Sequence, residues 1–526
     1  MAMFDTDAEE IDCLIRGLRL NSAMGWDGIP ATVIYSARNI LIPVICHVFN
    51  LALASGVFPK VFKKAVVHPI HKSGDRDSVN NYRPISVLSI LSKLLEKILN
   101  KRLLDYLCSL NILANNQYGF RSGKNTEDAI LELLDSVAQN LNNKQKNIAV
   151  FLDLSKAFDT VSVPLLLDKL DTIGIRGLPL DMFRSYLSDR SQIVKIGNHI
   201  SKEAFLTYGV PQGSVLGPTL FLVYINDLCT LDLTNSKVIA YADDTVILVH
   251  GSDWNEARLY AELALQTIMK WLTQNLLTLN LNKTTFITFS PRKASQPAPS
   301  FCLTAHSCHT VRGTFCGCTK IVRSDSIKYL GVWVDSALTW SDQINSLVSR
   351  VRKLIFVFKN LRTSANFSTL RTVYFALAHS ILTYCISAWG GAGKCLMLRL
   401  ERAQRAVLKV MAYKPFRFPT KELYRLWKLP TVRHSFVLST VLRKHSSLTY
   451  DPDLSRRKRK TDRVCPTAVV KLEIVRRQFL FYSPVLYNRI NKVLNIYPCA
   501  SRECKRLLDD WLATLAYEEL ENFVKP

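Results

Sequence analysis

The chain has 526 residues, 48% of them apolar and 21% charged, and a formal net charge of +25 at pH 7. This is the composition of a globular chain that buries a large core split into two or more subdomains. The positive charge predicts a polyanionic partner, with nucleic acid favoured, because a membrane surface would need a continuous basic amphipathic face beside exposed aromatic residues. Most of the excess lies in residues 340–463, which hold 25 Lys and Arg against 6 Asp and Glu.

Membrane insertion and secretion are not expected. Two apolar segments, residues 40–58 and 373–389, are interrupted by polar residues at roughly helical spacing, which predicts packed helices. The start of the chain lacks the charged residues and apolar run of a secretion signal, so we expect an intracellular protein of the nucleus and cytoplasm. In a reducing compartment the 13 scattered cysteines are expected to be buried or free thiols.

The predicted elements follow from apolar periodicity and from start and stop residues. In chain order we expect a helix over 31–58, a short strand over 65–70, helices over 86–107 and 126–141, a buried strand over 147–152, a helix between Ser162 and Gly174, a hairpin over 191–207, a helix over 219–228, a helix over 253–275 beneath a sheet, and a helical region over 341–411. Thr126 is the expected cap of its helix, because acidic residues follow it. Residues 290–300, rich in Pro, Ser and Ala, are expected to be a linker.

Two adjacent carboxylates stand in residues 241–244, Tyr-Ala-Asp-Asp. Apolar runs on both sides predict two buried strands, with the acidic pair at the turn of a hairpin. Because two ionised carboxylates side by side repel each other and resist burial, a bound cation is the usual relief. A further carboxylate, Asp153, ends the buried strand over 147–152, and a loop punctuated by Gly and Pro over 209–218 leads into a helix.

This order of motifs, a strand-end Asp, a Pro-Gln-Gly loop and a Tyr-x-Asp-Asp hairpin, resembles the palm of reverse transcriptases. Residues 81–86 (Asn-Tyr-Arg-Pro-Ile-Ser), 117–121 (Gln-Tyr-Gly-Phe-Arg) and 329–332 (Tyr-Leu-Gly-Val) resemble the fingers and primer-grip signatures of non-LTR, LINE-type retrotransposon polymerases of the Jockey or CR1 kind. The similarity runs from about residue 25 to about residue 411 and so covers most of the chain.

The resemblance implies an α+β fold of the right-hand polymerase type, with an antiparallel-sheet palm, fingers and a helical thumb. It implies an N-terminal extension over 1–60, fingers and palm over 61–335, a thumb over 336–414 and a C-terminal basic region over 415–526. It further implies an RNA-directed DNA polymerase that transfers a nucleotide from a dNTP to a primer 3′-hydroxyl. Its partners would be an RNA template and a DNA primer or target, with no membrane.

The resemblance also implies roles for individual residues. Phosphoryl transfer of this kind uses two cations on the attacking and leaving oxygens, and Mg²⁺ prefers oxygen ligands. By resemblance Asp153 and Asp243 bridge two Mg²⁺ ions, with Mn²⁺ as the alternative, and Asp244 assists. The resemblance assigns Lys72, Arg83, Leu154, Phe158, Gln212, Gly213 and Lys283 to the nucleotide site, and Tyr329, Leu330 and Gly331 to the primer grip. Phe158 would occupy the space of a 2′-hydroxyl, whereas the competing interpretation makes it a core residue.

Other functions remain as alternatives. A catalytically inactive nucleic-acid-binding relic of such an element is the main one, and the three intact aspartates argue against it. RNA-templated RNA polymerases typically carry Gly-Asp-Asp in the hairpin and a second Asp where this chain has Phe158. A two-metal nuclease or integrase would explain the carboxylates but not the Pro-Gln-Gly loop. Because only about sixty residues precede the fingers, we expect a truncated element or a polymerase-only product without an endonuclease.

Two further motifs have open interpretations. The basic run at 456–460 is a solvated loop, a backbone-binding patch or a nuclear import signal. A Cys-His group supplies enough ligands for a tetrahedral zinc site, but its spacing is not a standard one, and a thiol-rich hairpin is the favoured interpretation. Its members are Cys302, Cys308, His309, Cys316 and Cys318.

Overall fold

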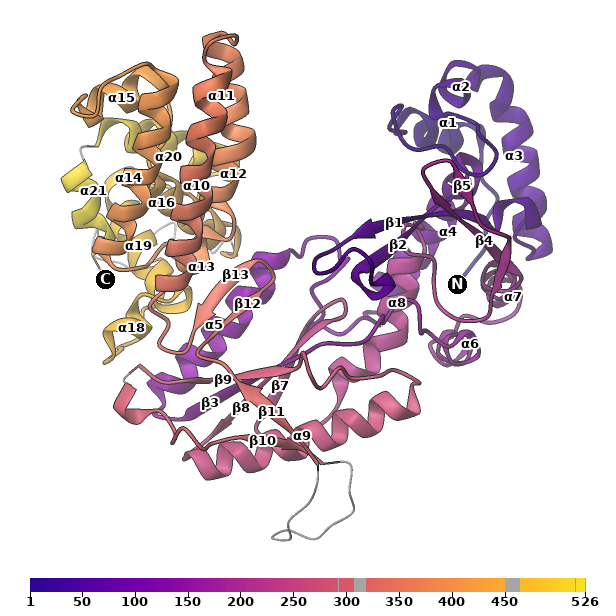
Figure 1. Cartoon of the computed structure of the whole chain (residues 1–526), viewed down its shortest axis with the longest axis horizontal. Coiled ribbons are helices and arrows are strands. Elements are labelled where there is room, and N and C mark those ends of the chain that lie inside the picture. The colour runs from indigo at the N-terminus through magenta and orange to yellow at the C-terminus, as the bar shows by residue number, and fades with distance from the viewer. Residues whose placement is uncertain (292, 307–317, 450–463, 516, 526) are drawn as a thin grey trace.

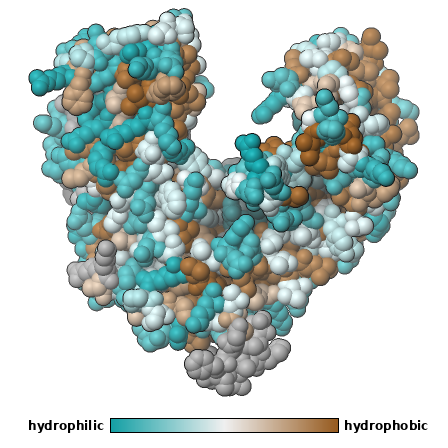
Figure 2. All heavy atoms as spheres, viewed as in Figure 1, coloured by the Kyte–Doolittle hydropathy of each residue, from teal (hydrophilic) through white to brown (hydrophobic). Residues whose placement is uncertain are grey.

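The computed structural model describes residues 1–526 except 292, 307–317, 450–463, 516 and 526. Two lobes rise on either side of a base that holds a sheet, the N-terminal lobe at the right of Figure 1 and the C-terminal, helical lobe at its left. The space-filling view shows an open cleft between the two lobes (Figure 2). The base, the N-terminal lobe and the helical lobe have the arrangement of palm, fingers and thumb, so the predicted α+β fold class is confirmed.

The palm is built on a sheet of six strands. They are β3 (Lys146–Leu152), β7 (Ser236–Tyr241), β8 (Asp244–Gly251), β9 (Thr285–Phe289), β10 (Leu303–Ala305) and β11 (Thr319–Arg323). Their order is β10-β11-β9-β3-β8-β7. The central strand β3 is antiparallel to β8 and β9, β7 forms an antiparallel hairpin with β8, and β9 is parallel to β11.

Helices cover both faces of this sheet. Ala149 of β3 belongs to the buried cluster that includes α5 (Thr126–Asn142). Its neighbours Ile148 and Val150 belong to the other cluster, which includes α9 (Trp254–Gln274). Because successive side chains of a strand point to opposite faces, the covered part of β3 must be apolar on both, and this explains the unbroken apolar run over residues 148–152.

The N-terminal lobe combines a small sheet with helices. Its strands are β1 (Lys64–His71), β2 (Tyr82–Val87), β4 (Arg190–Ile196), β5 (His199–Ile200) and β6 (Ala204–Leu206), in the order β2-β1-β4-β5 with β6 also paired to β4. The helices of the lobe and its border with the palm are α1 (Ala8–Arg16), α2 (Ala31–Ser36), α3 (Arg38–Ser55), α4 (Ile90–Ser109), α6 (Val163–Thr172), α7 (Leu178–Leu187) and α8 (Gly217–Ile225), with the short turns η1 (Lys60–Phe62), η2 (Val79–Asn81) and η3 (Asn226–Thr230).

The C-terminal lobe follows η4 (Lys293–Ser295) and the two-stranded sheet of β12 (Ser326–Tyr329) and β13 (Val332–Asp335). Its helices are α10 (Ser341–Leu361), α11 (Phe367–Tyr374), η5 (Phe375–His379), α12 (Ser380–Thr383), α13 (Ile386–Trp389), α14 (Lys394–Met411), α15 (Thr420–Trp427), α16 (Val432–Ser446), α18 (Glu473–Arg476), α19 (Phe479–Leu494), α20 (Ser501–Thr514) and α21 (Tyr517–Val524). One buried cluster runs through these helices on both sides of residue 414. The domain boundaries given above stay predictions.

Most predicted helices and strands are confirmed, and the differences lie at their ends. The helix expected over 31–58 is divided into α2 and α3 at Ala37, and it ends at Ser55, where Gly56 adopts a left-handed conformation. The prediction of a helix start at Ser86 is wrong, because Ser86 lies in β2 and the side chain of Ser89 caps the helix that begins at Ile90.

Two other predictions also need correction. The cap of α5 is Asn125 and not Thr126, and Asn125 forms a reciprocal capping box with Asp128. The expected linker over 290–300 packs on the sheet instead. Within it, the carbonyl of Ser295 accepts a hydrogen bond from the Trp254 indole, and Gln296 donates to the backbone of β9.

One helix among the described residues, α3, is long and apolar enough to cross a membrane by length and composition alone. Its mean hydropathy is 1.4, and 28% of its residues are buried. Ile40, Val44 and Leu51 are exposed on it. That this segment is a packed helix and not a membrane span stays a prediction.

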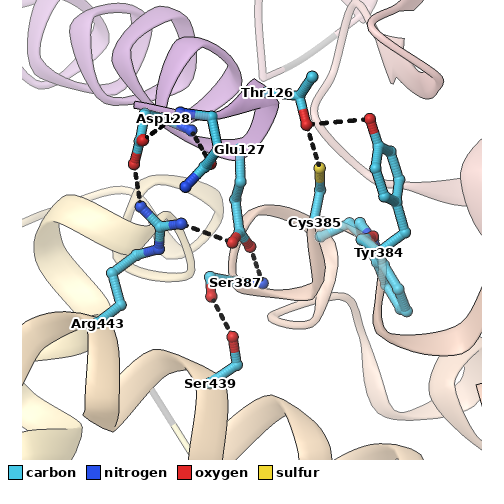
Figure 3. A network of polar contacts seen from close by, with 10 residues as sticks. Thr126, Glu127, Asp128, Tyr384, Cys385, Ser387, Ser439 and Arg443 are labelled. Atoms are coloured by element: carbon cyan, nitrogen blue, oxygen red, sulfur yellow. Dashed lines mark hydrogen bonds and ion pairs between the residues drawn. The ribbon is translucent and has the colours of Figure 1, made fainter. Parts of the chain in front are cut away.

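A network of polar contacts joins the palm to the C-terminal lobe (Figure 3). Arg443 of α16 bonds to Glu127 at 2.7 Å and to Asp128, both at the start of α5. Glu127 also accepts a hydrogen bond of 2.9 Å from the backbone N–H of Ser387. The hydroxyl of Tyr384 lies 3.1 Å from that of Thr126. The first turn of α5 therefore binds the palm to the C-terminal lobe.

Candidate active site

The acidic turn joins β7 to β8. Tyr241 pairs with Asp244 across the hairpin, so Ala242 and Asp243 form a two-residue turn. On the other side of β8, the last residue of β3 pairs with the residue after Asp244, and this register brings Asp153 opposite Asp244. Asp153 and the distant pair Asp243 and Asp244 therefore meet at one edge of the palm sheet.

A short extended segment supports this turn from the side. Gln117 forms a parallel bridge with Ala240 of β7, and the N–H of Tyr118 donates to the Ala240 carbonyl at 2.8 Å. Oε1 of the buried Gln117 accepts hydrogen bonds from the backbone N–H groups of Ala242, at 2.9 Å, and of Gly119, at 2.8 Å. Ala242 has a φ of 57°, which an L residue adopts only where its surroundings hold it. The motif expected in the fingers thus lies against the palm hairpin.

The surroundings of the carboxylates concentrate negative charge. Burial raises the pKa of Asp243, and the positive charges of Arg83 and Lys72 oppose this shift. Burial, followed by the charges of Asp243 and Asp153, raises the pKa of Asp244 to about 6, although part of its side chain remains exposed to solvent. Crowded carboxylates in partly desolvated surroundings favour a bound cation.

The Pro-Gln-Gly loop forms hydrogen bonds both to β2 and to the segment that follows β3. Nε2 of Gln212 donates to Asp159 at 2.8 Å, and the Gln212 carbonyl accepts from the N–H of Ser86 at 2.7 Å. Gly213 has a φ of +116°, and a Cβ at this position would lie 2.5 Å from the carbonyl oxygen of Ser86. Only glycine therefore fits here without a shift of the backbone.

A buried acidic residue on another helix accepts hydrogen bonds from the start of the helix that follows this loop. Glu96 of α4 accepts hydrogen bonds from the backbone N–H groups of Val215, at 2.7 Å, and Leu216, at 3.3 Å. Burial raises the pKa of Glu96, and the charge of Arg190 and these two N–H groups oppose the shift. The contact ties the start of α8 to α4 and so fixes the end of the loop.

Two aromatic rings fix Phe158, which lies five residues after Asp153. Its ring stacks on Phe221 with centroids 4.2 Å apart, and the ring of Phe120 meets it edge-on at 6.3 Å. Phe158 is half-buried, so one side of it packs on the core and part of it remains accessible. Its role on the floor of the nucleotide site stays a prediction.

The predicted primer grip is the tight turn between β12 and β13. Leu330 and Gly331 occupy the two turn positions, with φ of 45° and 86°. The hydroxyl of Tyr384 donates to the carbonyl of Leu330 at 2.8 Å, and its ring would lie 3.3 Å from a Cβ at position 331. Tyr329 is buried against Phe151 of β3, with ring centroids 5.3 Å apart. The C-terminal lobe therefore holds this turn over the central palm strand.

A cavity of about 350 Å³ lies between this turn and the acidic edge. Asp153, Asp244, Lys283, Lys328 and Tyr329 are among its lining residues. The structure thus brings two of the three aspartates, Lys283 of the predicted nucleotide site and the predicted primer grip to one cavity.

The other predicted nucleotide-site residues differ in position. Lys72, directly after β1, and Arg83, in β2, are both exposed, and their charges act on Asp243 and Asp244. Leu154 is buried and forms an isolated bridge with Leu279. Its side chain therefore packs in the core and does not line the site.

Two predicted motifs lie wholly or largely outside the described residues. Cys308, His309 and Cys316 fall within 307–317, and the basic run 456–460 falls within 450–463. The zinc interpretation of Cys302 to Cys318 and the three interpretations of the basic run therefore stay predictions.

Several residues that shape the site are not predicted from the sequence. Gln117 belongs to a motif that was recognised, but its contact with Ala242 spans 125 positions and has no local signal. Glu96 had a signal, since it is an acid within a helix predicted to be buried on one side. Tyr384 lies within an apolar segment, and nothing in the sequence indicates its bond to Leu330.

A sheet edge with three carboxylates, set between two lobes of a right hand, is the arrangement of a nucleic-acid polymerase palm. Residues 70–334 match the family described as reverse transcriptase (RNA-dependent DNA polymerase). The match covers half of the chain, and the chain belongs to this family.

Curated relatives agree with this assignment. The chain is 30% identical over 461 residues to the probable RNA-directed DNA polymerase from transposon BS of Drosophila melanogaster, which covers 84% of this chain and 49% of that protein. It is 28% identical over 433 residues to the RNA-directed DNA polymerase from mobile element jockey of the same species, covering 80% and 45%. The chain thus spans about half the length of these relatives. The resemblance to non-LTR retrotransposon reverse transcriptases is confirmed.

Solved structures also include similar folds. The telomerase of Candida albicans in complex with the TWJ fragment of telomeric RNA is similar over 87% of this chain and 68% of that chain, at 12% identity and a TM-score of 0.40. The apo telomerase of Candida tropicalis is similar over 59% of both chains, at 12% identity and a TM-score of 0.36.

Proposed function

We propose that this chain is the RNA-directed DNA polymerase of a non-LTR retrotransposon, which adds nucleotides from dNTPs to the 3′-hydroxyl of a primer paired with an RNA template. The observation that carries the proposal is the register of the palm sheet. It sets Asp153 opposite Asp244, with Asp243 in the adjoining turn. Membership of the reverse transcriptase family supports the same function.

The donor set fits two divalent cations. All three groups are carboxylates, the ligands that Mg²⁺ prefers, and Mn²⁺ accepts the same oxygens. Among the residues that the structure describes, none of the three is in a salt bridge with a Lys or Arg, so their charge is left for a cation. Asp153 and Asp243 would hold the two ions, with Asp244 assisting. Bound there, two Mg²⁺ ions stabilise the charge on the attacking and leaving oxygens.

The remaining residues of the site would bind and orient the nucleotide. The cations Lys72 and Arg83 are exposed beside the acidic edge and suit the triphosphate. Gln212 is held by Asp159 at 2.8 Å, which fixes the loop that would contact the base. Phe158, held by two other rings, would form the floor under the sugar.

Nucleic acid would lie in the cleft between the lobes. Helix α10 belongs to the C-terminal lobe on one side of this cleft (Figure 1), and four of its cations are exposed and free of salt bridges among the described residues. These are Arg350, Arg352, Lys353 and Lys359. Such unpaired cations suit a phosphate backbone and carry no sequence preference of their own.

Primer extension with Mg²⁺ and dNTPs on an RNA template tests the proposal. Wild-type protein should extend the primer on RNA, and Asp243→Asn should not. Asp232→Asn, which changes an exposed aspartate outside the site, is the matched control and should extend like wild type. Circular dichroism of each variant separates loss of chemistry from loss of fold. No extension by folded wild-type protein would instead favour the inactive nucleic-acid-binding relic.

A further inference from the structure

A cluster of metal-binding side chains lies in the C-terminal lobe, far from the acidic edge in the sequence. It consists of His445 near the end of α16, Cys499 in the loop before α20, and Cys504 in the first turn of α20. One ring nitrogen and the two sulfurs all lie within 4.8 Å of one another. His445 and Cys504 are buried, and Cys499 is half-buried.

Hydrogen bonds orient the histidine for metal binding. Its Nε2 lies 2.9 Å from the backbone carbonyl of Cys499, and a carbonyl can only accept, so Nε2 carries the proton. Nδ1 of the neutral ring then accepts a hydrogen bond from the hydroxyl of Tyr487 at 2.8 Å, and a cation bound at Nδ1 would displace this hydroxyl. A ligating histidine usually donates its other N–H to a carbonyl or carboxylate in this way.

The Cys499 thiol donates a hydrogen bond to the backbone carbonyl of Ile496 at 2.7 Å. On binding a cation the thiol would lose this proton and the hydrogen bond with it.

We propose that His445, Cys499 and Cys504 bind a Zn²⁺ ion that fixes α16 against α20 and the loop before it. An imidazole nitrogen and two thiolates are ligands that zinc accepts, and a water molecule would take the fourth position of the tetrahedron. Each thiol would release its proton on binding.

The site is independent of the polymerase proposal, and its test needs no activity. Full-length protein, purified without chelator from zinc-supplemented medium, should contain about one zinc per chain by elemental analysis. Cys504→Ser should lose this zinc. Cys229→Ser, which alters a buried thiol of the palm, should retain it. Cys316→Ser should also retain it, whereas zinc lost in that variant and kept in Cys504→Ser would overturn the proposal.

A second measurement on wild-type protein covers the case in which Cys504→Ser does not fold. Zinc is removed and replaced by Co²⁺, whose absorption reports its ligands. We expect a thiolate-to-cobalt charge-transfer band and tetrahedral ligand-field bands, and a fall in thermal stability when the metal is chelated. Metal-free protein with an unchanged unfolding temperature and no such bands would overturn the proposal.

Discussion

Oε1 of Gln117 accepts a hydrogen bond of 2.9 Å from the backbone N–H of Ala242, the residue before Asp243. The same oxygen binds the N–H of Gly119, whose missing side chain lets the two segments touch, since a Cβ there would lie 2.3 Å from the Ala242 nitrogen. Ala242 has a left-handed backbone conformation and precedes two carboxylates that repel each other. The segment that begins at Gln117 thus stabilises this turn from outside the hairpin.

Gln117→Met tests this support. It keeps the length of the side chain and removes the acceptor, so two buried N–H groups lose their partner at a cost of about 1 to 3 kcal/mol. We expect the turnover rate to fall at least tenfold because Asp243 loses its fixed position, with little change in the KM for dNTP. An unchanged turnover rate in the folded variant would show that the hairpin keeps Asp243 in position without Gln117.

Gly213→Ala should disrupt the Pro-Gln-Gly loop. The new Cβ would meet the Ser86 carbonyl at 2.5 Å, and the hydrogen bond between Ser86 and Gln212 would be lost. Gly197→Ala is the matched control, because Gly197 also has a positive φ but no atom within 4 Å of its Cβ position. Single-nucleotide extension should fall steeply in the first variant and only slightly in the second. Equal effects would mean that backbone conformation alone, and not contact with β2, sets the requirement.

Phe158→Val tests sugar selection. Shortening the ring should relieve the clash with a 2′-hydroxyl and raise incorporation of ribonucleotides relative to deoxynucleotides at least tenfold, about 1.4 kcal/mol. Activity with dNTPs should largely survive. Phe221→Leu removes the ring on which Phe158 stacks and should lower stability more than selectivity. Matched dNTP and rNTP extensions measure both, and unchanged selectivity in Phe158→Val would make Phe158 a packing residue.

Individual strands and helices are predictable from the sequence, whereas contacts between residues far apart in the chain are not. Apolar runs ending in Asp153 and flanking Asp243 predict β3, β7 and β8, because buried strands leave a continuous apolar signal. The bond between Tyr384 and Leu330 joins residues 54 positions apart and depends on how the lobes pack. The cysteines show the same limit: those over residues 302–318 are close together in the sequence, whereas the cluster at His445 is formed only by folding.

Asp135 makes the contact between palm and C-terminal lobe sensitive to pH. Its carboxylate accepts the N–H of Leu480 at 2.9 Å at the start of α19, and burial raises its pKa to about 7. A folded pKa above the unfolded value of about 3.9 means that stability falls as pH rises from about 4 toward 7 and is then constant. Asp135→Asn keeps an acceptor oxygen without the charge. At pH 8 its free energy of unfolding should therefore exceed that of wild type by about 1 to 2 kcal/mol, and its unfolding temperature should be higher. Near pH 4 the two proteins should have the same stability. A difference that does not change with pH would contradict this.

The central claim is that Asp153 and Asp243 act together at one sheet edge. The most direct measurement is the single-turnover rate of dNTP addition on an RNA template for wild type, Asp153→Asn, Asp243→Asn and the exposed control Asp232→Asn. We predict that each site variant falls by at least a thousandfold, that the double variant falls no further, because residues that act as a unit are not additive, and that the control matches wild type. Either site variant with a rate within tenfold of wild type would contradict the account.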